Sequence, residues 1–290
     1  MLATALNNAA ELLRAQGLVD AAEPLLVQAL SLRESALGPE NPSVAESLSN
    51  LGMLWKAQGR LEEAEPHLKR CIKIKEAVFG QDHWSVAISL NNLARVVGAR
   101  GNLKEAERLD RRCLAIKTAA HGPDHPSRAV TLNNLAQNCR ARGELEEAEQ
   151  LYRQAVEIWD GVYGDGHPLV ATVLNNLGLI VYQRGDRDQA TLLLRRALAI
   201  DEAVYGPSHP AVARDQNNLA DVLARPENEH EASTDAYEER RLEAVELLKR
   251  SVAIYESFYG ETHPHARGVM DNLVRILRDD EFEDDGGGGS

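Results

Sequence analysis

The chain has 290 residues, of which 45 are Asp or Glu and 32 are Lys or Arg, so its formal net charge is −13. Its composition, 43% hydrophobic and 27% charged residues, is that of a folded, soluble protein and excludes a disordered chain or a membrane protein. The acidic balance excludes nucleic acid as the main partner, because phosphate binding depends on clustered Lys and Arg. Three cysteines cannot form a closed disulfide framework, so we expect a reducing compartment and a cytoplasmic location.

A sequence repeat with a period of 42 residues runs through the chain. Glycine recurs at this interval in two series, one inside each unit and one at its end, and pairs of asparagines keep the same interval. The glycines that end the units are Gly38, Gly80, Gly122, Gly164 and Gly206, followed after 54 residues by Gly260. Several columns at one spacing indicate a repeat array rather than two domains of about 150 residues each.

Each repeat unit is predicted to form two helices, and the fifth unit shows the pattern clearly. Pro168 opens its first helix, because a proline at the first helical position loses no hydrogen bond. Leu174, Leu177 and Val181 recur at steps of three and four residues, which marks one buried helix face. Gly185 then ends the first helix, and a second helix with the same kind of apolar spacing follows it.

In chain order, the pattern predicts helix pairs and then a single final helix, all within one array over residues 1–278. The pairs are expected at 1–38, 42–80, 84–122, 126–164, 168–206 and 210–260, with the final helix at 264–278. The sixth pair contains 12 additional residues, and its polar stretch 225–240 lacks apolar periodicity, which predicts a long mobile loop. The predicted fold class is therefore all-α.

The two ends of the chain carry separate expectations. The chain starts inside a helix at Leu2, so we expect it to be a piece of a longer protein. Residues 279–290 are predicted to be disordered, since 279–285 form an acidic tail around Phe282 and 286–290 look like an engineered Gly-Ser linker. The acidic tail is either solvated or a pseudo-ligand for the binding surface of the chain.

The cysteines and histidines follow the repeat, which indicates structural roles. Cys71 and Cys113 stand where other repeats have small residues such as alanine, and Cys139 stands in an apolar column, so all three are predicted core residues. Histidines precede the helix-opening prolines once per repeat, which spreads them too widely for a shared metal ion. They are His125, His167, His209 and His263. We predict no metal site, no cofactor and no enzyme activity, because the sequence contains no catalytic or phosphate-binding motif.

Residues 125–158 carry the clearest copy of the unit, HPSRAVTLNNLAQNCRARGELEEAEQLYRQAVEI. Its spacing of leucine and small residues resembles the tetratricopeptide repeat, and the 42-residue form with G-x-x-H-P and L-N-N-L-A resembles the repeats of kinesin light chains. The resemblance covers residues 2–278. It implies a right-handed α-solenoid superhelix of helix-turn-helix repeats, in which the first helices line a concave, peptide-binding groove.

The resemblance also implies that the first asparagine of each pair faces this groove and binds the backbone of a peptide. An asparagine side chain has both a donor and an acceptor, so it can bind an extended backbone of any sequence. The alternative, that the asparagines only join neighbouring helices, suits the second member of each pair better. Among the charged inward positions of the first four repeats, Arg14, Lys56, Arg95 and Arg140 are basic and only Glu11 and Glu46 are acidic, so the groove is predicted to be net basic, which favours an acidic partner. The predicted peptide-binding residues are Asn7, Arg14, Lys56, Asn91, Arg95, Asn133, Arg140, Asn175, Leu179, Tyr182 and Asn217.

The sequence therefore predicts a protein–protein interaction scaffold whose basic groove binds an extended acidic peptide, as a cargo adaptor similar to kinesin light chain would. An apolar pocket beside Met53 or Leu179 is expected to hold an anchoring side chain of that peptide. Two alternatives stay open. In one, the basic residues only solvate a wide groove; in the other, the array is the sensor or oligomerisation region of a larger signalling protein, such as a nucleotide-binding receptor-like ATPase.

Overall fold

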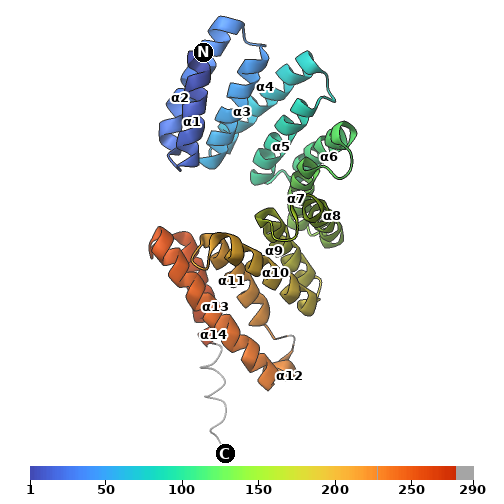
Figure 1. Cartoon of the computed structure of the whole chain (residues 1–290), viewed down its shortest axis with the longest axis vertical. Helices are drawn as coiled ribbons and strands as arrows, with labels where there is room; N and C mark the ends of the chain where they lie inside the picture. The colour runs from blue at the N-terminus through green and yellow to red at the C-terminus, as the bar shows by residue number, and fades with distance from the viewer. Residues whose placement is uncertain (227, 279–290) are drawn as a thin grey trace, which may run out of the picture. The chain divides into compact units, whose positions relative to one another are not determined.

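The computed structural model describes residues 1–226 and 228–278. These residues form fourteen helices and no strand, so the predicted all-α fold class is confirmed (Figure 1). By its internal contacts the chain divides into two compact units, Met1–Leu151 and Tyr152–Ser290, and the division falls within α8 (Leu145–Tyr163). None of the helices in the described ranges has the length and apolar character that crossing a membrane requires.

The first unit is a series of antiparallel helix hairpins. Its helices are α1 (Leu2–Ala15), α2 (Val19–Leu37), α3 (Pro42–Ala57), α4 (Leu61–Phe79), α5 (Trp84–Ala99), α6 (Leu103–His121), α7 (Pro126–Ala141) and the start of α8. The pairs α1–α2, α3–α4 and α5–α6 each form one repeat, and the second helix of each pair packs on the first helix of the next.

The second unit continues the same construction. Its helices are the remainder of α8, α9 (Pro168–Gln183), α10 (Arg187–Tyr205), α11 (Pro210–Leu223), α12 (Glu229–Ala232), α13 (Asp235–Tyr259) and α14 (Pro264–Arg278). Helix α9 packs on α10 and α11 on α13, whereas α14 packs on α13 as the first helix of a further repeat. The expectations for the tail and linker at 279–290 lie outside the described residues.

The polar insertion does not form the long loop predicted over 225–240. Within this stretch, Glu229–Ala232 form α12, and the residues from Asp235 onward form the first turns of α13, which is 25 residues long. Two side chains hold the segment in place. Arg187 donates a hydrogen bond to the backbone carbonyl oxygen of Arg225 at 2.6 Å, and the hydroxyl of Tyr237 donates to the backbone carbonyl oxygen of Ala224 at 3.1 Å. The prediction was wrong because side chains fix this segment through polar contacts, which leave no apolar period in the sequence.

Histidines cap the first helices of the repeats, as their place before the helix-opening residue predicts. The ring nitrogen Nδ1 of His83 accepts a hydrogen bond from the backbone N–H of Ser85 at 3.2 Å. This bond satisfies an amide that the helix itself leaves without a partner. Each capping ring also stacks on the ring that ends the preceding helix; the ring centres of Tyr205 and His209 are 4.4 Å apart. The same cap recurs at His125, His167 and His209.

Glycine ends both helices of a repeat because the turns need a left-handed backbone. Gly59, in the turn inside the second repeat, has a φ of 77°, and Gly80, at the end of that repeat, has a φ of 89°. A residue with a Cβ is strained in this region. A different constraint acts at Gly52 in α3, where a Cβ would lie 2.8 Å from Cγ of Leu68, so glycine permits the close packing of α3 and α4.

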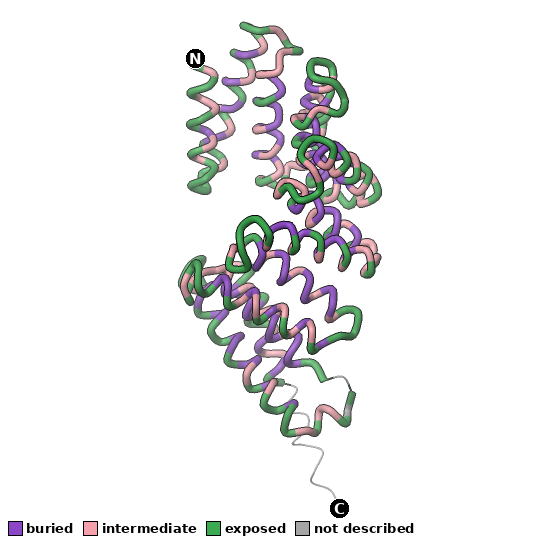
Figure 2. The backbone as a smooth tube through the Cα atoms, turned by 45° about the vertical axis from the view of Figure 1, so that its right-hand side comes forward, coloured by how far each residue is buried: buried purple, intermediate pink, exposed green. Residues whose placement is uncertain are grey.

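The small-residue columns of the repeat lie at the centre of the helix pairs. The alanines of one column are all 0% exposed, namely Ala22, Ala64, Ala106, Ala148, Ala190 and Ala244. Cys71, Cys113 and Cys139 are buried as well, which confirms that they are core residues. Burial raises the pKa of each thiol, for Cys139 to about 12, so the thiols stay protonated at neutral pH. Figure 2 shows that such buried positions line the helices, whereas the turns are exposed.

Buried cations join successive repeats in the first unit. The ammonium of Lys75 on α4 donates to the hydroxyl of Ser89 on α5 at 2.9 Å and to the backbone carbonyl oxygen of Ser85 at 3.2 Å. Arg33 and Lys117, at the equivalent positions of α2 and α6, make corresponding contacts with the next helix. All three cations are 7–9% exposed, so they act as polar joints inside the array rather than as surface charges.

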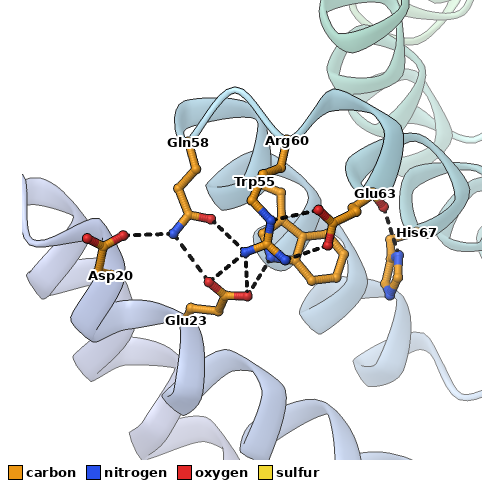
Figure 3. A network of polar contacts seen from close by, with 7 residues as sticks. All are labelled: Asp20, Glu23, Trp55, Gln58, Arg60, Glu63 and His67. Carbon is orange, nitrogen blue, oxygen red and sulfur yellow. Dashed lines mark hydrogen bonds and ion pairs between the residues drawn. The ribbon is translucent and has the colours of Figure 1, made fainter.

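A polar network fixes the junction between the first two repeats (Figure 3). The carboxylate of Glu23 on α2 accepts hydrogen bonds from the indole N–H of Trp55 at 2.8 Å and from the guanidinium of Arg60 at 2.7 Å. Arg60 also lies over the Trp55 ring, 5.1 Å from its centre, and pairs with Glu63. These contacts, led by the hydrogen bond from Trp55, lower the pKa of Glu23. The carboxylate is therefore ionised at neutral pH and ties α2 to the turn between α3 and α4.

Candidate peptide-binding face

The asparagine pairs form a ladder of hydrogen bonds between the first helices of successive repeats. In the first unit, the amide of Asn134 on α7 donates to the side-chain oxygen of Asn91 on α5 at 2.9 Å. The amide of Asn50 on α3 donates in the same way to Asn7 on α1 at 3.0 Å. The amide of Asn92 on α5 donates to the hydroxyl of Ser49 on α3 at 3.2 Å, so in this rung a serine stands in place of the accepting asparagine. The second asparagine of a pair therefore joins two repeats, and the first asparagine accepts its hydrogen bond.

We call the surface of α1, α3, α5 and α7 that carries this ladder the asparagine face. The predicted site residues on it are Asn7, Arg14, Lys56, Asn91, Arg95, Asn133 and Arg140. Because the side-chain oxygen of Asn91 is used in the ladder, only its amide N–H groups remain for a ligand; they make no hydrogen bond to another described residue, and 9% of Asn91 is exposed. Asn133 is half-buried at the corresponding position of α7.

Three cations on the asparagine face have no carboxylate partner among the described residues, namely Lys56, Arg95 and Arg140. Elsewhere in the first unit, most arginines form ion pairs; Arg60, for example, lies 2.7 Å from Glu23. Burial lowers the pKa of Lys56, and the positive charge of Arg95 lowers it further. The structure therefore brings Lys56 and Arg95 close enough for their charges to interact, which makes this part of the face basic.

Arg14 differs from the other three cations because it forms an ion pair on its own helix. Its guanidinium lies 2.8 Å from the carboxylate of Glu11, and the two side chains are 45% and 37% exposed. Such an exposed pair contributes little to stability. It does cancel the charge of Arg14 locally, so the basic character of the face comes from α3, α5 and α7.

Two exposed apolar side chains on the same face were not among the predicted site residues. Ile88 on α5 and Val130 on α7 stand at equivalent positions, and 42% and 39% of their surfaces are exposed. Ile88 shares one helix face with Asn91 and Arg95, three and seven residues further along α5. The same helical spacing that selected Asn91 and Arg95 would have found Ile88 in the sequence.

In the second unit, Asn175 is enclosed by protein contacts. Its amide donates to the carboxylate of Asp215 at 2.6 Å, and its side-chain oxygen accepts from Asn218 at 2.9 Å. Only 2% of Asn175 is exposed. Sequence reasoning could not place Asp215 beside it, because the two residues belong to different repeats.

The other predicted residues of the second unit are partly accessible. The side-chain oxygen of Asn217 on α11 accepts a hydrogen bond from Asn272 on α14 at 3.0 Å, which repeats the ladder of the first unit. Leu179 and Tyr182 are half-buried on α9. These residues occupy first helices, like those of the asparagine face.

One group of potential metal ligands occurs in the first unit. A ligand atom from each of Cys139, Glu144 and Glu147 lies within 4.8 Å of the other two. Both carboxylates already form ion pairs, Glu144 with Arg142 at 2.7 Å and Glu147 with Arg111 at 2.6 Å. The thiol is protonated at neutral pH, as described above, and a thiolate would be the metal ligand. We therefore interpret the group as structural.

The comparison with protein families identifies the repeat. The model of the tetratricopeptide repeat family matches residues 1–77, 85–160 and 139–203, which together exceed half of the chain. A comparison with curated proteins finds no match.

Several solved structures have a similar fold. One is a putative kinesin light chain of Podospora anserina with nearly identical TPR-like repeats; it is 27% identical, with a TM-score of 0.61, over 74% of this chain and 96% of that one. BtubC of P. vanneervenii is 22% identical, with a TM-score of 0.66, over 85% of this chain and 92% of its own. RapI in its apo form is 13% identical, with a TM-score of 0.67, over 96% and 94%. The last two comparisons concern the fold alone.

Tetratricopeptide arrays are scaffolds for protein interactions and not an enzyme family, in agreement with the expectation of a non-enzymatic protein. The helix pairs, the glycine turns and the small-residue core described above are the features that such repeats need. The chain belongs to the tetratricopeptide repeat family, in a form similar to the repeats of kinesin light chains.

Proposed function

We propose that the asparagine face binds an extended, acidic peptide of a partner protein. The observation that carries the proposal is the charge of the face. The chain has a net charge of −13, yet Lys56, Arg95 and Arg140 have no carboxylate partner among the described residues of this face. A local cluster of uncompensated cations attracts an anionic partner and raises its rate of encounter.

The ladder supports an extended peptide rather than a compact ligand. Its rungs repeat once per tetratricopeptide unit, so Asn7 and Asn91 offer amide N–H groups at intervals along the first unit. Amide donors pair with backbone carbonyl oxygens, which every peptide carries. The ladder therefore provides contacts that do not depend on peptide sequence, while the cations select for acidic side chains.

The apolar residues of the face supply an anchor. Ile88 and Val130 are exposed at equivalent positions of α5 and α7, on the two helices that also carry Arg95 and Arg140. Buried apolar or aromatic side chains dominate the energy of most protein interfaces. We place the anchoring side chain of the peptide at Ile88 and Val130, since both are more exposed than the half-buried Met53 and Leu179.

The direct test is charge reversal on the asparagine face, with Arg95→Glu and Arg140→Glu combined. The probe is a fluorescent peptide with the sequence of residues 279–285, Asp-Asp-Glu-Phe-Glu-Asp-Asp, and its affinity is measured by fluorescence anisotropy. We expect the double variant to bind at least about tenfold more weakly, because attraction is replaced by like-charge repulsion.

The matched control is Lys73→Glu with Lys104→Glu. These lysines are exposed on α4 and α6, have no carboxylate partner among the described residues, and produce the same change in net charge when reversed. The control variant should keep most of the affinity. Equal loss in both double variants would show that only the overall charge matters, and unchanged affinity in the Arg95 and Arg140 variant would refute the proposed function.

A further inference from the structure

A tryptophan replaces the helix-opening proline of the repeat at Trp84, the first residue of α5. The other first helices that follow a turn begin with proline, at Pro42, Pro126, Pro168, Pro210 and Pro264. Proline favours this position because its fixed φ suits the first helical turn. Trp84 gives no such advantage, and 49% of it is exposed. A large exposed aromatic side chain that the fold does not require is typical of an interaction site.

Trp84 belongs to a row of rings at the turn between α4 and α5. The imidazole of His83 stacks on the ring of Phe79, with ring centres 4.9 Å apart, and its centre lies 5.8 Å from that of the Trp84 indole. The backbone N–H of Ser85 donates to Nδ1 of His83, which fixes the imidazole. Because 44% of Phe79 is exposed, two large aromatic side chains face solvent beside a fixed ring.

Two carboxylates beside this row form no ion pair with a described cation. Asp82 lies in the same turn, and Glu40 lies in the equivalent turn before α3; both are exposed. The ladder joins α3 to α5, and adjacent helices pack about 8–10 Å apart, so the two turns are neighbours. The arginines that donate to the backbone of these turns, Arg70 and Arg112, are already paired with glutamates at 2.6 and 2.7 Å.

We call this surface the Trp84 edge and define it by Glu40, Phe79, Asp82, His83 and Trp84. It ends at the next repeat, where Pro126 replaces the tryptophan and Arg128 brings a cation to the turn by donating to the backbone carbonyl oxygen of Pro123. It is also separate from the basic part of the asparagine face, because Arg95 lies eleven residues further along α5, about 16 Å along the helix axis. The two surfaces have opposite charge.

We propose that the Trp84 edge binds a basic segment of a partner protein, with an Arg or Lys side chain over the indole of Trp84. The negative face of an aromatic ring attracts a cation, most strongly in tryptophan. The chain already contains such a contact, since the guanidinium of Arg60 lies 5.1 Å from the centre of the Trp55 ring. The carboxylates of Glu40 and Asp82 provide charge complementarity, and the neighbouring phenyl ring can cover the aliphatic part of a basic side chain. The inference goes beyond the proposed function and does not depend on it.

The test uses two labelled hexapeptides and the whole chain. The basic probe is Gly-Arg-Lys-Leu-Arg-Lys-amide with a neutral dye at its N-terminus, and the neutral probe has Gln in place of each Arg and Lys. Binding is measured by fluorescence anisotropy into the millimolar range, at an ionic strength of about 0.05 M. We expect the basic probe to bind at least about tenfold more tightly than the neutral probe.

The decisive variant is Trp84→Pro, which restores the residue of the other repeats. His83 already has the extended backbone that a following proline requires, with φ −74° and ψ 141°, so the variant should fold normally. We expect it to bind the basic probe about threefold or more weakly, because the contact between the cation and the indole is lost. The matched control is Leu192→Ala on α10, which truncates an apolar side chain that is 69% exposed and should leave the affinity unchanged.

The charge of the edge is tested with Glu40→Gln and Asp82→Asn combined. The matched control is Asp165→Asn with Glu261→Gln, because these carboxylates are exposed in the turns before α9 and α14, form no ion pair with a described residue and give the same change in net charge. We expect the first double variant to bind the basic probe at least about threefold more weakly and the control to keep most of the affinity.

The inference is overturned by no binding of the basic probe, by equal binding of the two probes, or by a Trp84→Pro variant that loses no more affinity than Leu192→Ala. Equal affinities of the two double variants would show that the carboxylates of the edge have no special role and would overturn it as well. The proposed function is tested separately, because charge reversal of Arg95 and Arg140 leaves the Trp84 edge intact, and Trp84→Pro leaves both arginines in place.

Discussion

At the scale of single residues, Asp110 and Asn138 depart most clearly from the repeat. Asp110 stands where other repeats have Leu26, Leu68 and Leu194, and it is 0% exposed. The amide of Asn138, itself in an otherwise apolar column, donates to its carboxylate at 2.8 Å, and the other carboxylate oxygen has no partner among the described residues. Burial raises the pKa of Asp110 to about 7.

The raised pKa has a defined effect on stability. Between the pKa of an aspartate in the unfolded chain, about 4, and the folded value, the folded state binds a proton that the unfolded state has released. Stability therefore falls as pH rises through this window. From pH 5 to pH 7, Asp110 should reduce the free energy of unfolding by about 2 kcal/mol.

The double variant Asp110→Leu with Asn138→Val restores the residue types of the other repeats and tests this effect. We expect the variant to be at least as stable as the parent at pH 5 and more stable at pH 7, because the buried carboxylate is gone and no polar partner is left behind. Urea unfolding at both pH values provides the measurement. Asp215 has the same sign of pKa shift and is present in both proteins, so the comparison isolates Asp110. An identical pH dependence of the two proteins would contradict the assignment.

At the scale of helices, the sequence pattern accounts for most element starts and ends. Pro168, Gly59 and the histidine caps act within a few residues of chain, so their structural effect follows from local rules. The helices within the insertion before α13 were not predicted. The contacts that the buried cations make with the next repeat were not predicted either. Arg187 and Lys75 reach partners on other helices, and an isolated polar side chain carries no periodic signal for such a contact.

The helix caps allow a quantitative prediction at this scale. His125→Ala should lower the free energy of unfolding by about 1 kcal/mol, because the first turn of α7 loses its side-chain acceptor. His125→Asn should cost only a few tenths of a kcal/mol, because asparagine is a strong N-cap residue. Asn41 already fills this role in the second repeat, where it accepts from the N–H of Ser43 at 2.9 Å. Denaturant unfolding of the two variants checks the difference, and equal losses would argue against a capping role.

At the scale of the whole molecule, the period of 42 residues was sufficient for the fold class and the family, whereas the site could be inferred only in part. The repeat register was enough to select Asn91 and Arg95 as site residues. It does not show which cations of the chain form ion pairs and which do not. The pair of Arg14 with Glu11, three residues earlier on the same helix, could be inferred from the sequence, whereas a pair between different helices, such as Arg111 with Glu147, could not. Similarly, Asn175 matches its column but is enclosed by Asp215 from the next repeat.

The net charge of −13 describes the whole chain and does not give the local charge of the asparagine face. Most arginines of the first unit are compensated by glutamates, such as Arg111 by Glu147 at 2.6 Å. Among the arginines and lysines without a carboxylate partner among the described residues, Lys56, Arg95 and Arg140 share the asparagine face, whereas Lys73 and Lys104 lie on α4 and α6. An acidic protein can therefore present a basic surface to its partner, and binding there should depend on electrostatic attraction that salt screens.

The measurement that tests this claim most directly is the salt dependence of peptide binding. The unaltered protein is titrated against the acidic heptapeptide and against a version with Asn and Gln in place of Asp and Glu, at ionic strengths of about 0.05 M and 0.5 M. We predict that the acidic peptide binds more tightly at low salt and loses about tenfold or more in affinity at high salt, while the neutral peptide binds weakly at both. Equal affinity of the two peptides, or an acidic peptide whose affinity does not change with salt, would contradict a basic, peptide-binding asparagine face.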